Sequence, residues 1–183
     1  MKEVSHGSDG SISLKSLENC INSDLANNYG NLCQRIFSFI KNNCKNKIQR
    51  TSNLLENEKK LIKKTDDLTK NLKHLMNNQN LNSYIKSVID ISFLTNKYIN
   101  DEEPWKLKKN NIEKMNNILH RSLDQIAKIS ILLSPIIPNS TNKVLDALKI
   151  NKDLRNLSFL DGKKIFTDKI EINNLDILFK KIN

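Results

Sequence analysis

Apolar residues recur every three, four or seven positions along most of this chain, and this periodicity is typical of amphipathic α-helices. The pattern runs through residues 14–40, 54–75, 81–98 and 112–133, and a shorter helix is predicted over 140–148. The 183 residues include only four glycines and three prolines, which argues against a turn-rich β-sandwich or barrel. Because helices with short connections bury their apolar faces against each other, we expect an all-α helix bundle.

Composition divides the chain into three parts. Residues 1–12 are polar and contain two of the four glycines, so they are expected to form an arm or linker. Ser13 precedes the first helical pattern and is a candidate N-cap, and the helical bundle is predicted to occupy residues 13–150. Residues 151–183 show no clear periodicity, and we expect this C-terminal segment to pack on the bundle.

The helical pattern is interrupted at two places, and each interruption predicts a local feature of the structure. Gly30 lies inside the first pattern, where a glycine costs about 1 kcal/mol relative to alanine and can mark the close approach of another group. Asp101, Glu102 and Glu103 interrupt the third pattern and are followed by Pro104. Proline suits the first turn of a helix and acids suit its N-terminus, so a new helix is predicted to begin here.

The charge of the chain favours an acidic partner. Thirty Lys and Arg residues against twenty Asp and Glu give a net charge of +10, which is typical of proteins that bind nucleic acid, an anionic membrane or an acidic protein. Only four of the basic residues are arginines. Lys, Asn and Ile share A/T-rich codons, so a base bias of the genome is an equally good explanation for part of the excess. Between Lys41 and Leu75, ten basic and four acidic residues form either a solvated helix surface or a non-specific phosphate-binding surface.

The sequence contains no motif of a stand-alone catalyst. It has no phosphate-binding glycine loop, no zinc-protease motif and no nucleophile elbow. The three cysteines include no CxxC pair and the three histidines are scattered, so neither a metal site nor a disulfide framework is expected. The apolar run Ile129–Pro138 is too short to span a bilayer, and no secretory leader opens the chain. We therefore expect a cytoplasmic protein with no catalytic residue, cofactor or metal of its own.

Three residues are candidates for nucleic-acid recognition. Asn31 and Arg35 are four apart, hence on one helical face, and both side chains can make paired hydrogen bonds to a base edge. Gly30 beside them would let a planar ligand approach the backbone. Trp105 is the only tryptophan and follows a helix break, where an exposed ring could stack on an unpaired base. A solvent-facing polar pair and a core tryptophan are the alternatives that the residues alone leave open.

Four stretches resemble a known family. GSDGSISLKSLENCINSDLANNYGNLCQR (Gly7–Arg35) and NKYINDEEPWKLKK (Asn96–Lys109) are similar to the region that follows the catalytic domain of methionyl-tRNA synthetases. LLSPIIPNSTNKVLDALKI (Leu132–Ile150) resembles the closing helices of that region, and LFKKI near the end resembles its usual terminus. The resemblance covers essentially the whole chain, is most specific in the first two stretches, and is weak across 44–80 and 151–176.

The resemblance implies the α-helical anticodon-binding domain of a class I aminoacyl-tRNA synthetase. Trp105 matches the family tryptophan that stacks on the first base of the methionine anticodon, CAU. Asn31 and Arg35 match the residues that hydrogen-bond in the anticodon pocket, while Pro104 matches the proline that positions the tryptophan. The implied partners are methionine tRNA and the enzyme's own catalytic domain. The longer enzyme uses ATP to attach methionine to tRNA, and this segment is expected to act as a monomer.

The sequence also departs from the family pattern. Ser5 and His6 stand where the family more often has Pro-Phe, and the chain has no counterpart of the HIGH and KMSKS signatures that bind ATP. We therefore expect a catalytically inactive C-terminal piece of a longer enzyme. The anticodon domain of another class I synthetase, for cysteine or valine, is one alternative. A non-enzymatic helical module that binds phosphates or an acidic protein through Lys41–Leu75 is the other.

Overall fold

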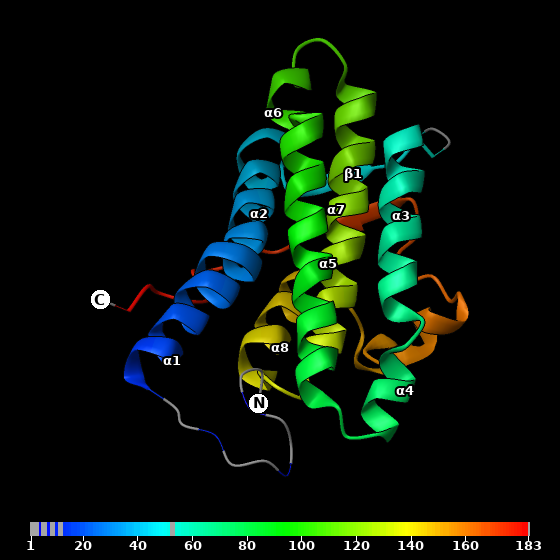
Figure 1. Cartoon of the computed structure of the whole chain (residues 1–183). Helices are drawn as coiled ribbons and strands as arrows, with labels where there is room; N and C mark the ends of the chain where they lie inside the picture. Colours follow the sequence, from blue (N-terminus) through cyan, green and yellow to red (C-terminus); the bar gives the residue numbers. More distant parts are fainter. Residues whose placement is uncertain (1–3, 5–6, 8–9, 11–12, 52–53, 183) are drawn as a thin grey trace.

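The computed structural model describes residues 4, 7, 10, 13–51 and 54–182, so Ser5, His6 and most of the expected arm lie outside the described residues. It is a helix bundle, as predicted (Figure 1). In chain order the elements are α1 Leu14–Cys20, the π-helical η1 Ile21–Gly30, α2 Asn31–Cys44, β1 Lys47–Gln49, α3 Glu56–Thr69, α4 Leu72–Asn77, α5 Leu81–Glu102, α6 Pro104–Leu107, α7 Ile112–Leu133, α8 Pro138–Ala147, the 3-10 turns η2 Lys152–Leu154 and η3 Leu157–Asp161, and β2 Lys169–Glu171.

The two longest helices, α5 and α7, form the centre of the bundle. They pack along each other, with α2 on one side and α3 on the other (Figure 1). Most residues of α7 are buried, including polar ones, because neighbours surround this helix. Asn111 caps its N-terminus, its side chain accepting a hydrogen bond from the Lys114 amide at 2.9 Å. Helix α7 is therefore the core element against which the other helices are placed.

The first helical pattern forms one continuous helix whose winding changes. Ser13 caps it as predicted, its side chain accepting a hydrogen bond from the Ser16 amide at 3.0 Å. Residues Ile21–Gly30 are π-helical, between α-helical turns on both sides. The apolar residues at the start of this pattern are not buried, because α1 extends away from the bundle and Leu14 remains 80% exposed (Figure 1). Burial becomes strong only from η1 onward.

The break between α5 and α6 differs in one respect from the prediction. Pro104 occupies the first turn of a new helix, as expected. Asp101 and Glu102, however, end α5 instead of leading into α6, and each forms an ion pair, with Lys97 at 3.3 Å and with Lys114 at 2.9 Å. Only Glu103 separates the helices, in a left-handed conformation with φ of 45°. This single residue turns the chain so that α6 begins immediately.

A buried carboxylate holds α3 against α7. Glu58 is fully buried and accepts two hydrogen bonds from the Arg50 guanidinium, at 2.8 and 3.0 Å. It also accepts one from the Leu55 amide at 2.8 Å and lies 3.5 Å from Nε of Arg121 on α7. Such a network compensates the cost of burying charge only because its members are paired and hydrogen-bonded. It fixes the helix that flanks α5 on the side away from α2.

The C-terminal segment returns along the bundle. Strand β2 pairs antiparallel with β1, with Ile170 opposite Ile48, and this small sheet was not predicted from the sequence. Ile170 and Phe159 are buried, so parts of this segment belong to the hydrophobic core. Near its end, the backbone of Ile182 makes two hydrogen bonds with the Asn22 side chain, at 2.8 and 2.9 Å. Ile182 therefore lies beside η1, which continues the first helix (Figure 1).

Candidate nucleic-acid interface

Arg35 and Trp105 meet at the junction of α2, α5 and α6. The guanidinium carbon of Arg35 lies 5.5 Å from the centre of the Trp105 ring, within the range of a cation–π contact. Arg35 Nη2 also donates a hydrogen bond to Oδ1 of Asn100 at 2.8 Å. These two contacts hold the guanidinium in place on the protein surface. Two of the candidate residues, 70 positions apart in the sequence, therefore form one site.

A shallow pocket of about 320 Å³ is formed at this junction. It is lined by Arg35, Ile36, Phe39, Ile99, Pro104 and Trp105. Pro104 is buried and fixes the start of α6, while Trp105 beside it remains 38% exposed. An apolar floor, an exposed indole and a fixed guanidinium are the groups that bind a planar base by stacking and hydrogen bonding.

Asn31 lies outside the lining of this pocket. It is exposed at the start of α2, one helical turn before Arg35, as the spacing predicted. Within the described part of the chain its side chain has no hydrogen-bond partner. The structure thus brings Arg35, Pro104 and Trp105 together and places Asn31 farther along the same surface.

Gly30 is close to another part of the same chain. A Cβ atom at this position would lie 2.8 Å from the Leu25 carbonyl oxygen and 3.0 Å from the ring of Phe179. Phe179 comes from the C-terminal segment and also packs on Tyr29, with ring centres 6.3 Å apart. The interpretation that an isolated glycine marks a close approach is confirmed, but the approaching group is an aromatic side chain of the C-terminal segment.

Four residues of the site were missed by the sequence interpretation. Ile36, Phe39 and Ile99 line the pocket, and Asn100 orients Arg35. Asn100 could have been noticed, because it follows Asn96 by four residues on one face of a helix. Asn96 donates hydrogen bonds to the Asn28 side-chain oxygen at 2.9 Å and to its backbone oxygen at 3.3 Å. Asn96 and Asn100 thus attach α5 to η1 and α2.

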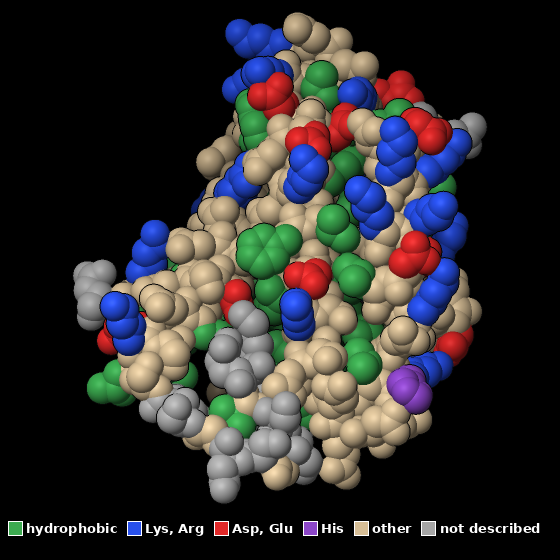
Figure 2. Space-filling view, in the orientation of Figure 1, with side chains coloured by type: hydrophobic (Ala, Val, Ile, Leu, Met, Phe, Trp, Pro, Cys, Tyr) green, Lys and Arg blue, Asp and Glu red, His purple; other side chains and the backbone are tan. Residues whose placement is uncertain are grey.

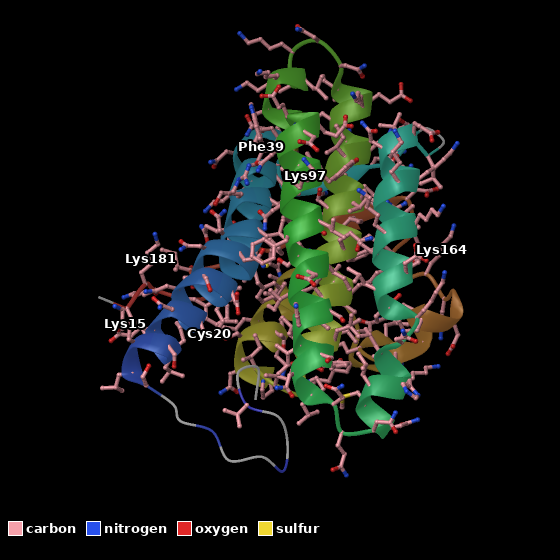
Figure 3. All side chains as sticks on the ribbon, viewed as in Figure 1. Lys15, Cys20, Phe39, Lys97, Lys164 and Lys181 are labelled. Carbon is pink, nitrogen blue, oxygen red and sulfur yellow. The ribbon has the colours of Figure 1, made fainter. Side chains whose placement is uncertain are left out.

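The surface around the site is basic on the α6 side. Lys106, Lys108 and Lys109 follow Trp105 directly and are exposed, although Lys106 pairs with Glu103 at 2.8 Å. Figure 3 shows Phe39 on α2 and Lys97 on α5 toward the α6 end of the bundle. In Figure 2, basic side chains, with acidic ones among them, lie around the apolar ones on this face. Phosphates of a nucleic acid bound at the pocket would therefore meet positive charge.

Within the described residues, many lysines of the Lys41–Leu75 stretch, unlike Lys108 and Lys109, lie next to acidic side chains. Several of those on α3 and around α4 pair with acids, as Lys59 does with Glu56 at 3.6 Å and Lys70 with Asp67 at 2.6 Å. The hydrogen bond and charge of Lys70 lower the pKa of the Asp67 carboxyl, so that this acid stays ionised. Local pairing reduces the net field of this stretch at the surface. A larger hollow of about 720 Å³ lies between α3, α7 and the C-terminal segment, and neither Arg35 nor Trp105 lines it.

Metal binding, thiol chemistry and membrane insertion were also considered for the described part of the chain. Among these residues, no group of three or more His, Cys, Asp or Glu side chains could hold a metal ion. Burial raises the pKa of the Cys33 thiol, which disfavours the reactive thiolate, and the three cysteines form no disulfide with one another. Among the described helices, none is long and apolar enough to cross a membrane.

Comparison with known proteins gives a consistent result. Residues 48–183 match the family model described as the anticodon binding domain of methionyl tRNA ligase. The methionine–tRNA ligase of Rickettsia conorii is 34% identical over 184 residues, covering 99% of this chain and 36% of the relative, and that of Brucella suis is 32% identical over 155 residues. The chain thus spans about a third of the length of these relatives. A crystal structure of Mycobacterium tuberculosis methionyl-tRNA synthetase superposes with a TM-score of 0.91 and 24% identity, covering 100% of this chain and 37% of that one.

The fold and the family model agree over the region that contains Trp105 and most of the bundle. The chain belongs to the methionyl-tRNA synthetase anticodon-binding domain family.

Proposed function

We propose that this domain reads the CAU anticodon of methionine tRNA. The first anticodon base leaves its stack and lies on the exposed face of Trp105, and Arg35 tests the edge of that base. Asn31, one turn along α2, contacts the same or the adjoining nucleotide. The observation that carries this proposal is the contact of Arg35 with Trp105 and Asn100, which presents a ring and an oriented hydrogen-bond donor together.

Catalysis belongs to the remainder of a longer enzyme in this proposal. The relatives are methionine–tRNA ligases about three times as long as the matched segment. The bound anticodon would hold the tRNA so that its acceptor end reaches the catalytic domain, where ATP activates methionine. A structure of the Mycobacterium tuberculosis relative is described with methionyl-adenylate bound. We place this activity in the cytoplasm, where tRNA is charged for translation.

The test is binding of RNA hairpins to the 183-residue chain. A hairpin with a CAU loop should bind more tightly than one whose first loop base is changed. Trp105→Ala should weaken binding of the CAU hairpin by roughly 5- to 150-fold, the range for loss of one aromatic stack. Trp105→Phe keeps a ring and should lose less.

Two outcomes would contradict the proposal. Equal affinity for both hairpins would remove base recognition, and unchanged affinity of the Trp105→Ala protein would remove the stacking platform. If binding depended only on lysines of the Lys41–Leu75 stretch, the non-enzymatic helical module would be the better description. Hairpins with cysteine or valine anticodons serve as competitors, because tighter binding of either would indicate another class I synthetase.

A further inference from the structure

Phe93 is an exposed aromatic residue that the proposed anticodon pocket does not include. It lies on α5 with half of its surface exposed, more than Trp105. A hollow of about 570 Å³ beside it is lined by Lys64, Asp67, Leu68, Asp90, Phe93, Leu94 and Lys97. Figure 2 shows apolar side chains along this face of the bundle. Phe93 is therefore part of an apolar surface continuous with neighbouring side chains of α3 and α5.

The position of Phe93 on α5 relates it to the pocket. Phe93 and Asn100 are seven residues apart, so they share one face of the helix and lie about 10 Å apart along its axis. Asn100 binds Arg35, and one turn earlier Asn96 binds Asn28. Because these two hydrogen bonds join α5 to the η1–α2 helix in parallel register, Phe93 lies near the level of Asn28.

This register places four candidate contacts in order along one surface. Trp105 lies at one end, Arg35 comes next, Asn31 follows one turn down α2, and Phe93 lies at the other end on α5. Helix α5 runs nine residues beyond Phe93 to Glu102 before α6 begins, so about 14 Å of helix axis separate Phe93 from the end of α5 next to Trp105. Two stacked base steps of about 3.4 Å cover only about 7 Å. The first and third bases of an anticodon therefore reach both rings only in an unstacked loop with a more extended backbone.

The charged side chains around Phe93 favour one path for the phosphate backbone of a bound RNA. Lys97 is exposed on the adjoining turn, and its pair with Asp101 at 3.3 Å is a surface contact that contributes little and can be exchanged for a phosphate. Elsewhere the lining of the hollow carries both signs of charge, Lys64 with Asp67 and Asp90, so a phosphate gains less there than beside Lys97. The backbone would therefore pass by Lys97, with a base turned toward the Phe93 ring.

We propose that Phe93 is a second stacking platform, which holds the third anticodon base while Trp105 holds the first. This inference rests on the proposed function and adds a second contact to it. The ring at the far end fixes the direction of the loop across Arg35 and Asn31. A single aromatic platform would leave the loop free to rotate about the first base.

The experiment measures hairpin binding to the 183-residue chain with Phe93 variants. Phe93→Ala should weaken binding of the CAU hairpin by roughly 5- to 150-fold, and Phe93→Leu, which keeps apolar volume without a ring, should show most of that loss. Phe93→Trp should retain or improve affinity. Leu17→Ala removes an equally exposed apolar side chain on α1 and should bind as the original does. Because Phe93 is half exposed, thermal unfolding curves should match.

Hairpins lacking single bases locate the contact. Removing the third anticodon base should weaken binding to the original chain and cause no further loss in Phe93→Ala. Removing the first base should show the same non-additivity with Trp105→Ala and remain additive with Phe93→Ala.

The outcomes separate the two proposals. If Trp105→Ala loses affinity but Phe93→Ala binds within twofold of the original chain, the second platform is overturned and anticodon reading stands. Loss in Phe93→Ala that stays additive with removal of the third base also overturns it. If neither the first base nor Trp105 affects binding, anticodon reading fails, and the second platform fails with it.

Discussion

At the scale of single residues, Arg35 shows how the site is prepared before any ligand arrives. Its guanidinium donates to Asn100 and lies over Trp105, so its rotamer is already fixed. A preorganised side chain loses less entropy on binding, which leaves more of the contact energy for affinity. The helical spacing was enough to predict that Asn31 and Arg35 share a face. It could not predict the meeting with Trp105, because contacts between distant segments leave no local pattern.

Gly30 provides a prediction at this scale. Replacing glycine by alanine inside a helix normally stabilises it by about 1 kcal/mol, but here the new Cβ would lie 2.8 Å from the Leu25 carbonyl oxygen. We expect Gly30→Ala to lower the free energy of unfolding by about 1–3 kcal/mol, the usual cost of overpacking. Urea denaturation measures the change.

A second variant identifies the cause of that loss. Phe179 can move, whereas the backbone oxygen of Leu25 cannot move without disturbing the π-helical turn. In a Phe179→Ala background, Gly30→Ala should still cost at least half as much. Full recovery there would show that the aromatic ring alone requires the glycine.

At the scale of elements, the predictable parts are those with local causes. Helix α7 spans the predicted residues, since its apolar period is regular and Asn111 caps it. The break at Pro104 was also predicted, but the end of α5 was not, because one left-handed residue, Glu103, suffices to separate two helices. Strand β2 is three residues long, and its partner lies more than a hundred residues earlier, so neither alternation nor a nearby turn signals it.

His120 offers a test of how the C-terminal segment is attached. Its Nε2 donates to the Thr167 carbonyl at 2.8 Å, and burial lowers the pKa of the ring, an effect only partly offset by that hydrogen bond and by Asp124. Below the ordinary value of 6.5 the unfolded chain binds a proton that the folded chain does not. The free energy of unfolding should therefore fall as pH drops through 6.5, until the lowered pKa of the folded state is passed.

The matched variant is His120→Gln, whose amide can still donate to Thr167. It should lose less stability between pH 7.5 and 5.5 than the original chain, as measured by urea unfolding at both values. The same loss in both proteins would show that other groups cause the acid sensitivity.

At the scale of the whole molecule, the basic residues behind the net charge of +10 differ in how far neighbouring acids neutralise them. Lysines around α3 are partly neutralised by neighbouring acids, while those after Trp105 adjoin the proposed site. Composition could therefore indicate an acidic partner without showing where it binds. Codon bias and attraction of tRNA can both contribute to the lysine excess, and only their positions in space distinguish the useful charges.

Salt dependence separates these two groups of lysines. Replacing Lys106, Lys108 and Lys109 by glutamine should reduce the slope of log affinity against log salt by up to about 2, at roughly 0.7 for each phosphate contact of a single strand. Replacing Lys59, Lys60 and Lys63 on α3 removes the same charge and should change the slope less. The reverse order would favour binding through the Lys41–Leu75 surface.

The hydrogen bonds between Asn22 and Ile182 also affect the order in which contacts can form during synthesis. These residues are 160 positions apart, and Phe179 reaches Gly30 from nearly as far along the chain. A ribosome must therefore have made Phe179 and Ile182 before the first helix acquires these partners. Until then the helix that carries Arg35 lacks the ring that packs against its π-helical turn, although every residue that lines the pocket of Arg35 and Trp105 has already been synthesised.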